Sequence, residues 1–205
     1  MKKDDQRTTN LTTGELLCFI YENRYIKECV SNKKKDKNSI SYLIDRNLSQ
    51  SECIKLGIGY ERILTDIITG TTSLKDIKGK MKKGKRERDH IFCDEVNHKI
   101  YYSELKGNLN LDTEKSKSTY KKCMRNVQEI IDEYPGYTIE WCLVGFRYLT
   151  LDDFPNTIKY KYRPIKENIV GMNEYLRMLD VPLQFTDESH LFFINQLVNE
   201  MFPKS

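Results

Sequence analysis

The run from Tyr137 to Phe146 constrains the fold of this chain more than any other segment, because it is the most apolar strand-like stretch of the sequence. It is far shorter than the roughly 20 residues of a membrane span, and it suits a strand that is buried on both faces. Such a strand lies in the centre of a sheet. We therefore expect an α/β protein with a mixed central sheet that is flanked by helices.

Before this run, the spacing of apolar residues changes from a helical period to the period of two that is typical of strands. His90–Asp94 and Lys99–Leu105 predict two strands joined at Asn97-His98, which together form a β-hairpin. A long amphipathic helix, capped by Asp112, is expected to follow and to end at Pro135-Gly136. Further helices are expected over residues 13–30, 49–68, 167–179 and 188–201, a mobile loop over 70–88, and a short strand at 159–163.

The 205 residues fit a single domain. We expect a core over residues 49–146, with a helical N-terminal addition (1–48) and a C-terminal addition of strand and helices (147–205). The first residues, Met1 to Asn10, show no signal peptide, and the six cysteines form no Cys-x-x-Cys pair. These features predict an intracellular, cytoplasmic protein with reduced cysteines and no membrane span.

The positive charge is concentrated in three stretches, although the formal net charge is only +4. They are Lys75 to Arg88, Lys115 to Arg125 and Lys159 to Arg163, and the last one alternates with tyrosines. Each stretch alone is typical of a solvated surface. Together they favour a face that binds a polyanion such as nucleic acid.

Three residues around the hairpin predict a site that binds a cation. Glu104 and Lys106 lie two apart in one strand, so their side chains point to the same face, and Asp89 begins the neighbouring strand. Two adjacent carboxylates repel one another unless a cation or proton lies between them, and Mg²⁺ is the usual solution. The alternative is an exposed cross-strand ion pair at a sheet edge.

Asp89 followed by Glu104-Leu105-Lys106 resembles the PD-(D/E)XK signature of restriction-endonuclease-like nucleases. The predicted order of elements from Ser49 to Phe146 is similar to the core of that family. Gly107–Ser116 also looks like a loop-to-helix stretch of some type II restriction endonucleases. Arg88 stands where the signature has proline, and the first core strand is expected around residues 73–78. A second acid-x-Lys set, residues 76–78, falls within the predicted loop and is set aside.

The resemblance implies Mg²⁺-dependent phosphodiester hydrolysis with one or two ions per active site. Asp89, Glu104 and the Leu105 carbonyl would ligate the metal, and Glu61 would join its outer coordination shell. Lys106 would orient or deprotonate the attacking water and stabilise the developing charge. The function implied is that of a type II restriction endonuclease, which cuts double-stranded DNA at a short specific site.

The family interpretation also implies partners. A two-fold homodimer would match a palindromic site, with helices at 168–179 or 190–201 as candidate contacts, and a modification methyltransferase is expected in the same host. A helix N-terminus after the metal strand would offer N–H groups to a phosphate, although the asparagines there also suit an ordinary turn. The expected DNA-binding residues are Lys82, Lys83, Lys85, Arg86, Asn108, Asn110, Lys115, Ser116 and Lys117.

Two other functions remain open from the sequence. One is a repair or recombination nuclease of the same fold that recognises DNA structure. The other is a non-catalytic nucleic-acid-binding protein. The acid–acid–lysine set argues against the second, because pure binding has no use for carboxylates that face a polyanion.

Overall fold

The protein is described by a computed structural model that covers residues 10–26, 48–80, 88–107 and 109–203. A five-stranded mixed sheet in the order β1-β2-β3-β4-β5 forms its centre. The strands are β1 (Lys75–Asp76), β2 (His90–Asp94), β3 (Lys99–Lys106), β4 (Thr138–Gly145) and β5 (Ile169–Val170). β1, β2 and β3 pair antiparallel, whereas β3, β4 and β5 pair parallel. The predicted α/β class with a mixed sheet is confirmed.

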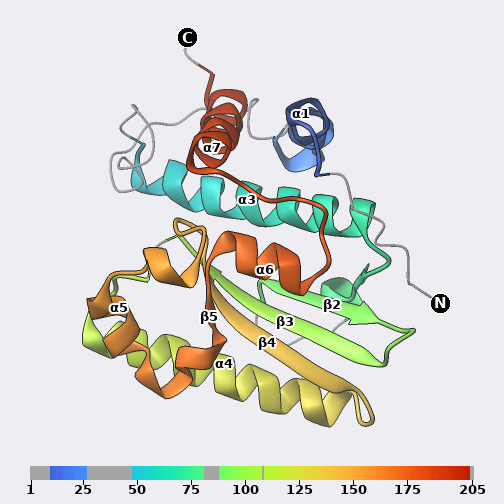
Figure 1. Ribbon diagram of the computed structural model, residues 1–205, viewed down its shortest axis with the longest axis vertical. Coiled ribbons are helices and arrows are strands. Elements are labelled where there is room, and N and C mark those ends of the chain that lie inside the picture. The colour runs from blue at the N-terminus through green and yellow to red at the C-terminus, as the bar shows by residue number, and fades with distance from the viewer. Residues whose placement is uncertain (1–9, 27–47, 81–87, 108, 204–205) are drawn as a thin grey trace, which may run out of the picture.

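Helices cover both faces of the sheet (Figure 1). The α-helices are α1 (Thr13–Glu22), α3 (Gln50–Thr71), α4 (Thr113–Glu133), α5 (Asn156–Lys161), α6 (Met172–Met178) and α7 (Asp187–Met201), and the 3₁₀ helices are η1 (Lys78–Lys80), η2 (Leu151–Asp153) and η3 (Arg163–Asn168). α3 and α6 cover one face, and α4 and α5 cover the other. α1 and α7 pack against α3 on its outer side.

Both predicted helix starts that flank the core are confirmed. Ser49 caps α3 and Glu52 closes a capping box, in which the Glu52 carboxylate accepts the Ser49 N–H at 2.8 Å. Asp112 caps α4, and its Oδ1 accepts the Lys115 N–H at 2.8 Å. Gly136 follows α4 with φ +91°, a left-handed conformation that glycine adopts without strain.

The helix predicted over residues 13–30 is interrupted at Asn23: α1 ends at Glu22, and residues 24–26 are helical again. Asn23 is extended, its Oδ1 accepts the N–H groups of Tyr25 and Ile26, and its Nδ2 donates to Asp66 of α3 at 2.6 Å. These two bonds cap the helical turn that begins after Asn23, so the chain forms two helical pieces where one continuous helix was expected. Residues 27–30 lie outside the described part of the chain.

The loop predicted over residues 70–88 is partly wrong. α3 continues to Thr71, and β1 pairs with β2 through Lys75↔Cys93 and Asp76↔Phe92. A first strand therefore lies within the expected residues 73–78. Residues 81–87 lie outside the described ranges.

The strand predicted at residues 159–163 is a helix followed by a 3₁₀ turn. Ile158 and Tyr162 are both buried and lie four residues apart, which places them on one face of α5, while Tyr160 is 78% exposed. The alternation of lysine and tyrosine therefore resembles a strand pattern, although these residues are helical. β5 was not predicted, because two residues carry no periodic signal.

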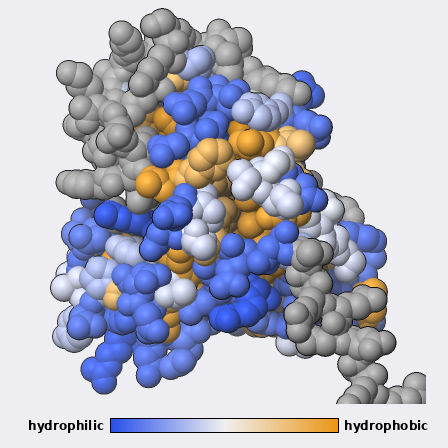
Figure 2. Space-filling model, turned by 45° about the horizontal axis from the view of Figure 1, so that its top comes forward, coloured by the Kyte–Doolittle hydropathy of each residue, from blue (hydrophilic) through white to orange (hydrophobic). Residues whose placement is uncertain are grey.

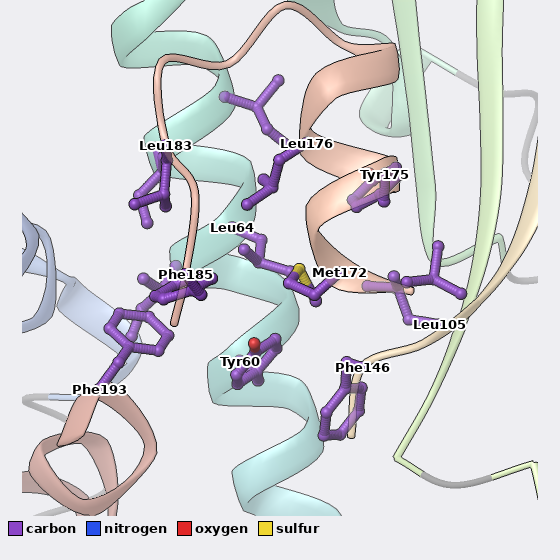
Figure 3. Close-up of a cluster of buried hydrophobic side chains, with 14 of the residues drawn as sticks. Tyr60, Leu64, Leu105, Phe146, Met172, Tyr175, Leu176, Leu183, Phe185 and Phe193 are labelled. Atoms are coloured by element: carbon purple, nitrogen blue, oxygen red, sulfur yellow. The ribbon is translucent and has the colours of Figure 1, made fainter. Parts of the chain in front are cut away.

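Among the described residues, the larger of two hydrophobic clusters joins the sheet to α3, α6 and α7 (Figure 3). Tyr60 of α3 stacks on Phe146 with ring centroids 4.5 Å apart, and Phe193 of α7 meets the edge of Tyr60. The Tyr60 hydroxyl lies 2.9 Å from Nε2 of the buried His190. The N-terminal and C-terminal helices therefore share one core with the sheet.

The outer surface on the side of α1 and α7 shows a band of apolar residues between hydrophilic regions (Figure 2). Exposed apolar side chains on these helices include Tyr21, Leu191 and Phe192. Within the described residues, no helix combines the length and the apolar character that crossing a membrane requires.

His190 predicts a pH dependence of stability. Burial lowers its pKa to about 4, below the usual 6.5. Between these two values the unfolded chain binds a proton that the folded protein does not, so the free energy of unfolding decreases as the pH falls from 6.5 to 4. In urea titrations at pH 7 and pH 4.5, we expect His190→Gln to remove on the order of 2–3 kcal/mol of this decrease. The exposed residue His98, changed to Asn, serves as the control. An unchanged pH dependence in His190→Gln would contradict the assignment.

Candidate active site

The hairpin places the three residues of the predicted signature together. The last paired residues of β2 and β3 are His90↔Ser103, so the next position sets Asp89 opposite Glu104. Glu104 and Lys106 share the face of β3 that carries Tyr102, which is the face covered by α4. Leu105 points to the opposite face and packs in the cluster with α3.

Side-chain contacts connect these three residues. Lys106 Nζ lies 2.7 Å from Glu104 Oε1 and 3.8 Å from Asp89 Oδ2. Asp89 Oδ2 also accepts the N–H of Leu105 at 2.7 Å, which ties the Asp89 carboxylate to the end of β3. Glu104 is fully buried, while Lys106 and Asp89 keep 33% and 16% of their side chains exposed. The site therefore opens to solvent at Lys106.

A fourth charged residue, Lys122, belongs to the site although the sequence analysis did not assign it there. Its Nζ lies 2.7 Å from Glu104 Oε1, the same oxygen that Lys106 contacts, and its side chain is 31% exposed. We call Asp89, Glu104, Lys106 and Lys122 the acid–lysine cluster. Its two carboxylates and two ammonium groups balance in charge.

Tyr102 and Asn126 orient the buried carboxylate. Asn126 of α4 donates from Nδ2 to the Tyr102 hydroxyl at 2.8 Å, and this hydroxyl donates to Glu104 Oε2 at 3.3 Å. Both residues are buried. The sequence held a signal for each: Tyr102 lies two residues before Glu104 in the strand, and Asn126 interrupts the apolar stripe of an amphipathic helix.

The charges of the cluster shift its pKa values. Burial and the charge of Glu104 raise the pKa of Asp89. Burial alone would raise the pKa of Glu104 as well, but Lys106 and Lys122 outweigh it and leave this pKa below its usual value. Burial would lower the pKa of Lys106, and the two carboxylates outweigh that effect and raise it. Glu104 and Lys106 are therefore held in their charged forms.

The donor atoms of the cluster suit a small divalent cation. Within a strand, the N–H and C=O of one residue point to the same side, so the Leu105 carbonyl faces the side on which Asp89 accepts the Leu105 N–H. Two carboxylates and one carbonyl supply only oxygen, and Mg²⁺ typically takes one or two carboxylates and keeps several waters. Among the described residues, no group of three or more His, Cys, Asp or Glu side chains could hold a metal.

Glu61 and His90 meet on the other side of the sheet. The Glu61 carboxylate forms an ion pair with Lys78, and the Glu61 carbonyl accepts a hydrogen bond from His90 Nε2 at 2.9 Å. His90 Nδ1 therefore accepts from the Tyr175 hydroxyl, 2.6 Å away. His90 is buried, and burial lowers its pKa to about 4. The metal role of Glu61 stays a prediction.

The structure separates the residues predicted to bind DNA. Asn110, Lys115 and Lys117 are exposed, and Lys115 Nζ lies 3.2 Å from Asp112. Ser116 is 1% exposed and its hydroxyl donates to the Thr113 carbonyl, so it offers no surface group to a phosphate, contrary to our expectation. Lys82, Lys83, Lys85, Arg86 and Asn108 lie outside the described residues.

The site thus combines two carboxylates and two ammonium groups at the end of β3, next to exposed basic residues at the start of α4. In a partly open site of this kind, the two carboxylates can hold a cation and the ammonium groups can contact a phosphate group. In comparisons with protein-family models, curated proteins and solved structures, nothing matches this chain.

Proposed function

We propose that this protein is a type II restriction endonuclease, which hydrolyses phosphodiester bonds of double-stranded DNA at a short specific site with Mg²⁺. The observation that carries the proposal is the convergence of Asp89, Glu104 and Lys106 at one end of β3. A metal-dependent hydrolase needs carboxylates for the cation and a positive group beside the attacked phosphate. This arrangement provides both within 4 Å.

Each residue of the site would have its own role. Asp89, Glu104 and the Leu105 carbonyl would hold the Mg²⁺, which when bound supplies a Lewis acid for the phosphate and lowers the pKa of a bound water. The ammonium of Lys106 would orient the attacking water and stabilise the negative charge that develops on the phosphate. Tyr102 and Asn126 would keep the Glu104 carboxylate in one orientation.

The order of elements supports the same family interpretation. A capped helix (α3), three antiparallel strands (β1 to β3), a second helix (α4) and a parallel strand (β4) follow one another along the chain. This is the order that the resemblance implied. The short β1 supplies a strand where the family core requires one.

A basic groove elsewhere on α4 supports a nucleic acid as the substrate. The groove lies between α4 and α5 and has a volume of about 690 Å³. Its lining residues are Thr113, Lys117, Tyr120, Asn156, Thr157, Tyr160, Lys161, Arg163 and Pro164. Three of these are basic and none is acidic, which suits a phosphate backbone. Lys161 also donates to the Leu111 carbonyl at 2.6 Å, which ties α5 to the loop after β3.

Cleavage of both strands at a palindrome would favour a homodimer. Of the two candidate contacts, α6 buries Met172, Tyr175 and Leu176 in the core, which leaves it poorly suited to a dimer interface. α7 exposes Leu191 and Phe192 and is the helix that we propose for a dimer contact.

The test of the proposed function is a plasmid of known sequence, incubated with the purified protein in Mg²⁺ and, separately, in EDTA. Discrete fragments that form only with Mg²⁺ would support a site-specific endonuclease. Cleavage of branched DNA without discrete plasmid fragments would support a structure-recognising nuclease instead. Salt-sensitive binding without cleavage of plasmid, genomic or branched DNA would reject an enzyme.

The groove predicts a measurable loss of DNA affinity. The double variant Lys117→Ala/Arg163→Ala should bind duplex DNA more weakly and lower the slope of log affinity against log salt by about 2, because each lost phosphate contact contributes roughly 0.9. Fluorescence anisotropy at several salt concentrations measures both effects. Lys166→Ala is the matched control, since Lys166 is exposed and pairs with Glu167. An unchanged slope in the double variant would show that the groove does not contact the DNA phosphates.

A further inference from the structure

Lys122 occupies a position in the acid–lysine cluster that a metal would need. Its ammonium and that of Lys106 both lie 2.7 Å from Glu104 Oε1, while Oε2 accepts the Tyr102 hydroxyl. Both oxygens of the only fully buried carboxylate of the cluster are therefore in contact with donors. A cation that binds Glu104 through Oε1 competes with at least one of the two ammonium groups.

The two lysines differ in how they are held. Lys106 lies on β3 itself and is within 4 Å of both carboxylates, Glu104 and Asp89. Lys122 reaches Glu104 from a different element, the third turn of α4, on a long side chain that is 31% exposed. Lys122 is thus the ammonium that can leave the carboxylate and turn toward solvent without a change in the strand.

We propose that Lys122 holds the place of the divalent cation in the metal-free protein. Its ammonium neutralises the buried Glu104 carboxylate, is displaced from Oε1 when the cation binds, and then faces the DNA phosphate. This inference rests on the proposed function, because it assumes that Asp89 and Glu104 are metal ligands. The proposal accounts for the charge balance of the cluster. Its two ammonium groups neutralise its two carboxylates, so the buried Glu104 carboxylate is compensated before any metal binds.

The first test is the affinity of the protein for Mg²⁺ and Mn²⁺ alone, measured by isothermal titration calorimetry without DNA. Lys122→Met keeps the length of the side chain and removes the charge, so it should bind either cation at least tenfold more tightly than the original protein. Lys121→Met, an exposed neighbour on the same helix, should leave the affinity unchanged. An affinity of Lys122→Met that is equal to or weaker than that of the original protein would overturn the proposal.

The second test is thermal unfolding in EDTA and in Mg²⁺. Lys122→Met should melt at a lower temperature than the original protein in EDTA and should gain more from Mg²⁺, because the cation replaces the missing charge. If this variant does not fold, Lys122→Arg keeps a positive charge and grips a carboxylate with two N–H groups, so it should bind Mg²⁺ more weakly than the original protein. A tighter affinity of Lys122→Arg would contradict the placeholder role.

These outcomes separate the two proposals. If the original protein binds neither cation and cuts no DNA, the proposed function fails. If it binds Mg²⁺ and cuts DNA but Lys122→Met binds no tighter, only the placeholder role fails, and Lys122 is then a structural link between α4 and the sheet.

Discussion

Replacing Lys106 with alanine is expected to lower DNA cleavage by about 10²- to 10⁴-fold, the range typical of losing a positioned proton donor or charge in an active site. The ammonium of Lys106 is the group of the cluster that reaches both carboxylates and remains a third exposed, so it is placed to touch the water and the phosphate. Rates are measured on plasmid with Mg²⁺. Mg²⁺ and DNA binding should persist, because Asp89, Glu104 and the groove are unchanged.

Lys99→Ala is the matched control for this variant. Lys99 lies at the opposite end of the same strand and pairs with Glu140 of β4, so its loss removes a lysine from β3 without changing the site. We expect its cleavage rate to stay within about twofold of the original, because the contact is far from the chemistry. Turnover retained in Lys106→Ala would refute the catalytic assignment.

The second large effect concerns stability. Arg88→Ala is expected to lower the free energy of unfolding by about 3–5 kcal/mol, the usual result of removing one partner from a buried ion pair. The Arg88 side chain is fully buried and lies 3.2 Å from both Glu129 and Glu133 of α4. Its loss leaves two carboxylates of α4, only partly exposed, without this counter-charge. Urea unfolding followed by circular dichroism measures the effect.

Arg125→Ala provides the comparison on the same helix. Arg125 is exposed, and its replacement should change stability by less than about 0.5 kcal/mol, as is usual for surface positions. A loss below about 1 kcal/mol in Arg88→Ala would show that the ion pairs with α4 contribute little beyond the cost of burying them.

The fold followed from the sequence where strong local signals agreed. The Ser49–Glu52 capping box, the Asp112 cap and the Asn97-His98 turn each specify a helix start or a hairpin through contacts over a few residues. Failures occurred where a distant contact decided the outcome. Asn23 interrupts the first helix with a side chain that also binds Asp66 of α3, and β5 exists only because it pairs with β4.

The positions of the site residues on β2 and β3 could be predicted from the sequence, whereas the contacts that α4 makes with the sheet could not. The register of an antiparallel hairpin places Asp89 beside Glu104, which the spacing already implied. Lys122 and Asn126 reach Glu104 and Tyr102 from a helix, and their positions depend on how α4 is rotated against the sheet. A single sequence does not encode that rotation in any short pattern, so the fourth charge of the site emerged only from the structure.

The central place of β3 has a consequence for motion. β3 is paired with β4 from Lys99 to Lys106 and with β2 from Lys99 to Ser103, and it carries Glu104 and Lys106 at its end. Fraying of an edge such as β1 or β5 does not reach these residues, so their backbone amides should exchange hydrogen mainly through openings close to global unfolding. The backbone geometry at Glu104 and Lys106 is therefore as long-lived as the folded state, and faster rearrangements of the site belong to side chains or peripheral segments rather than to this strand.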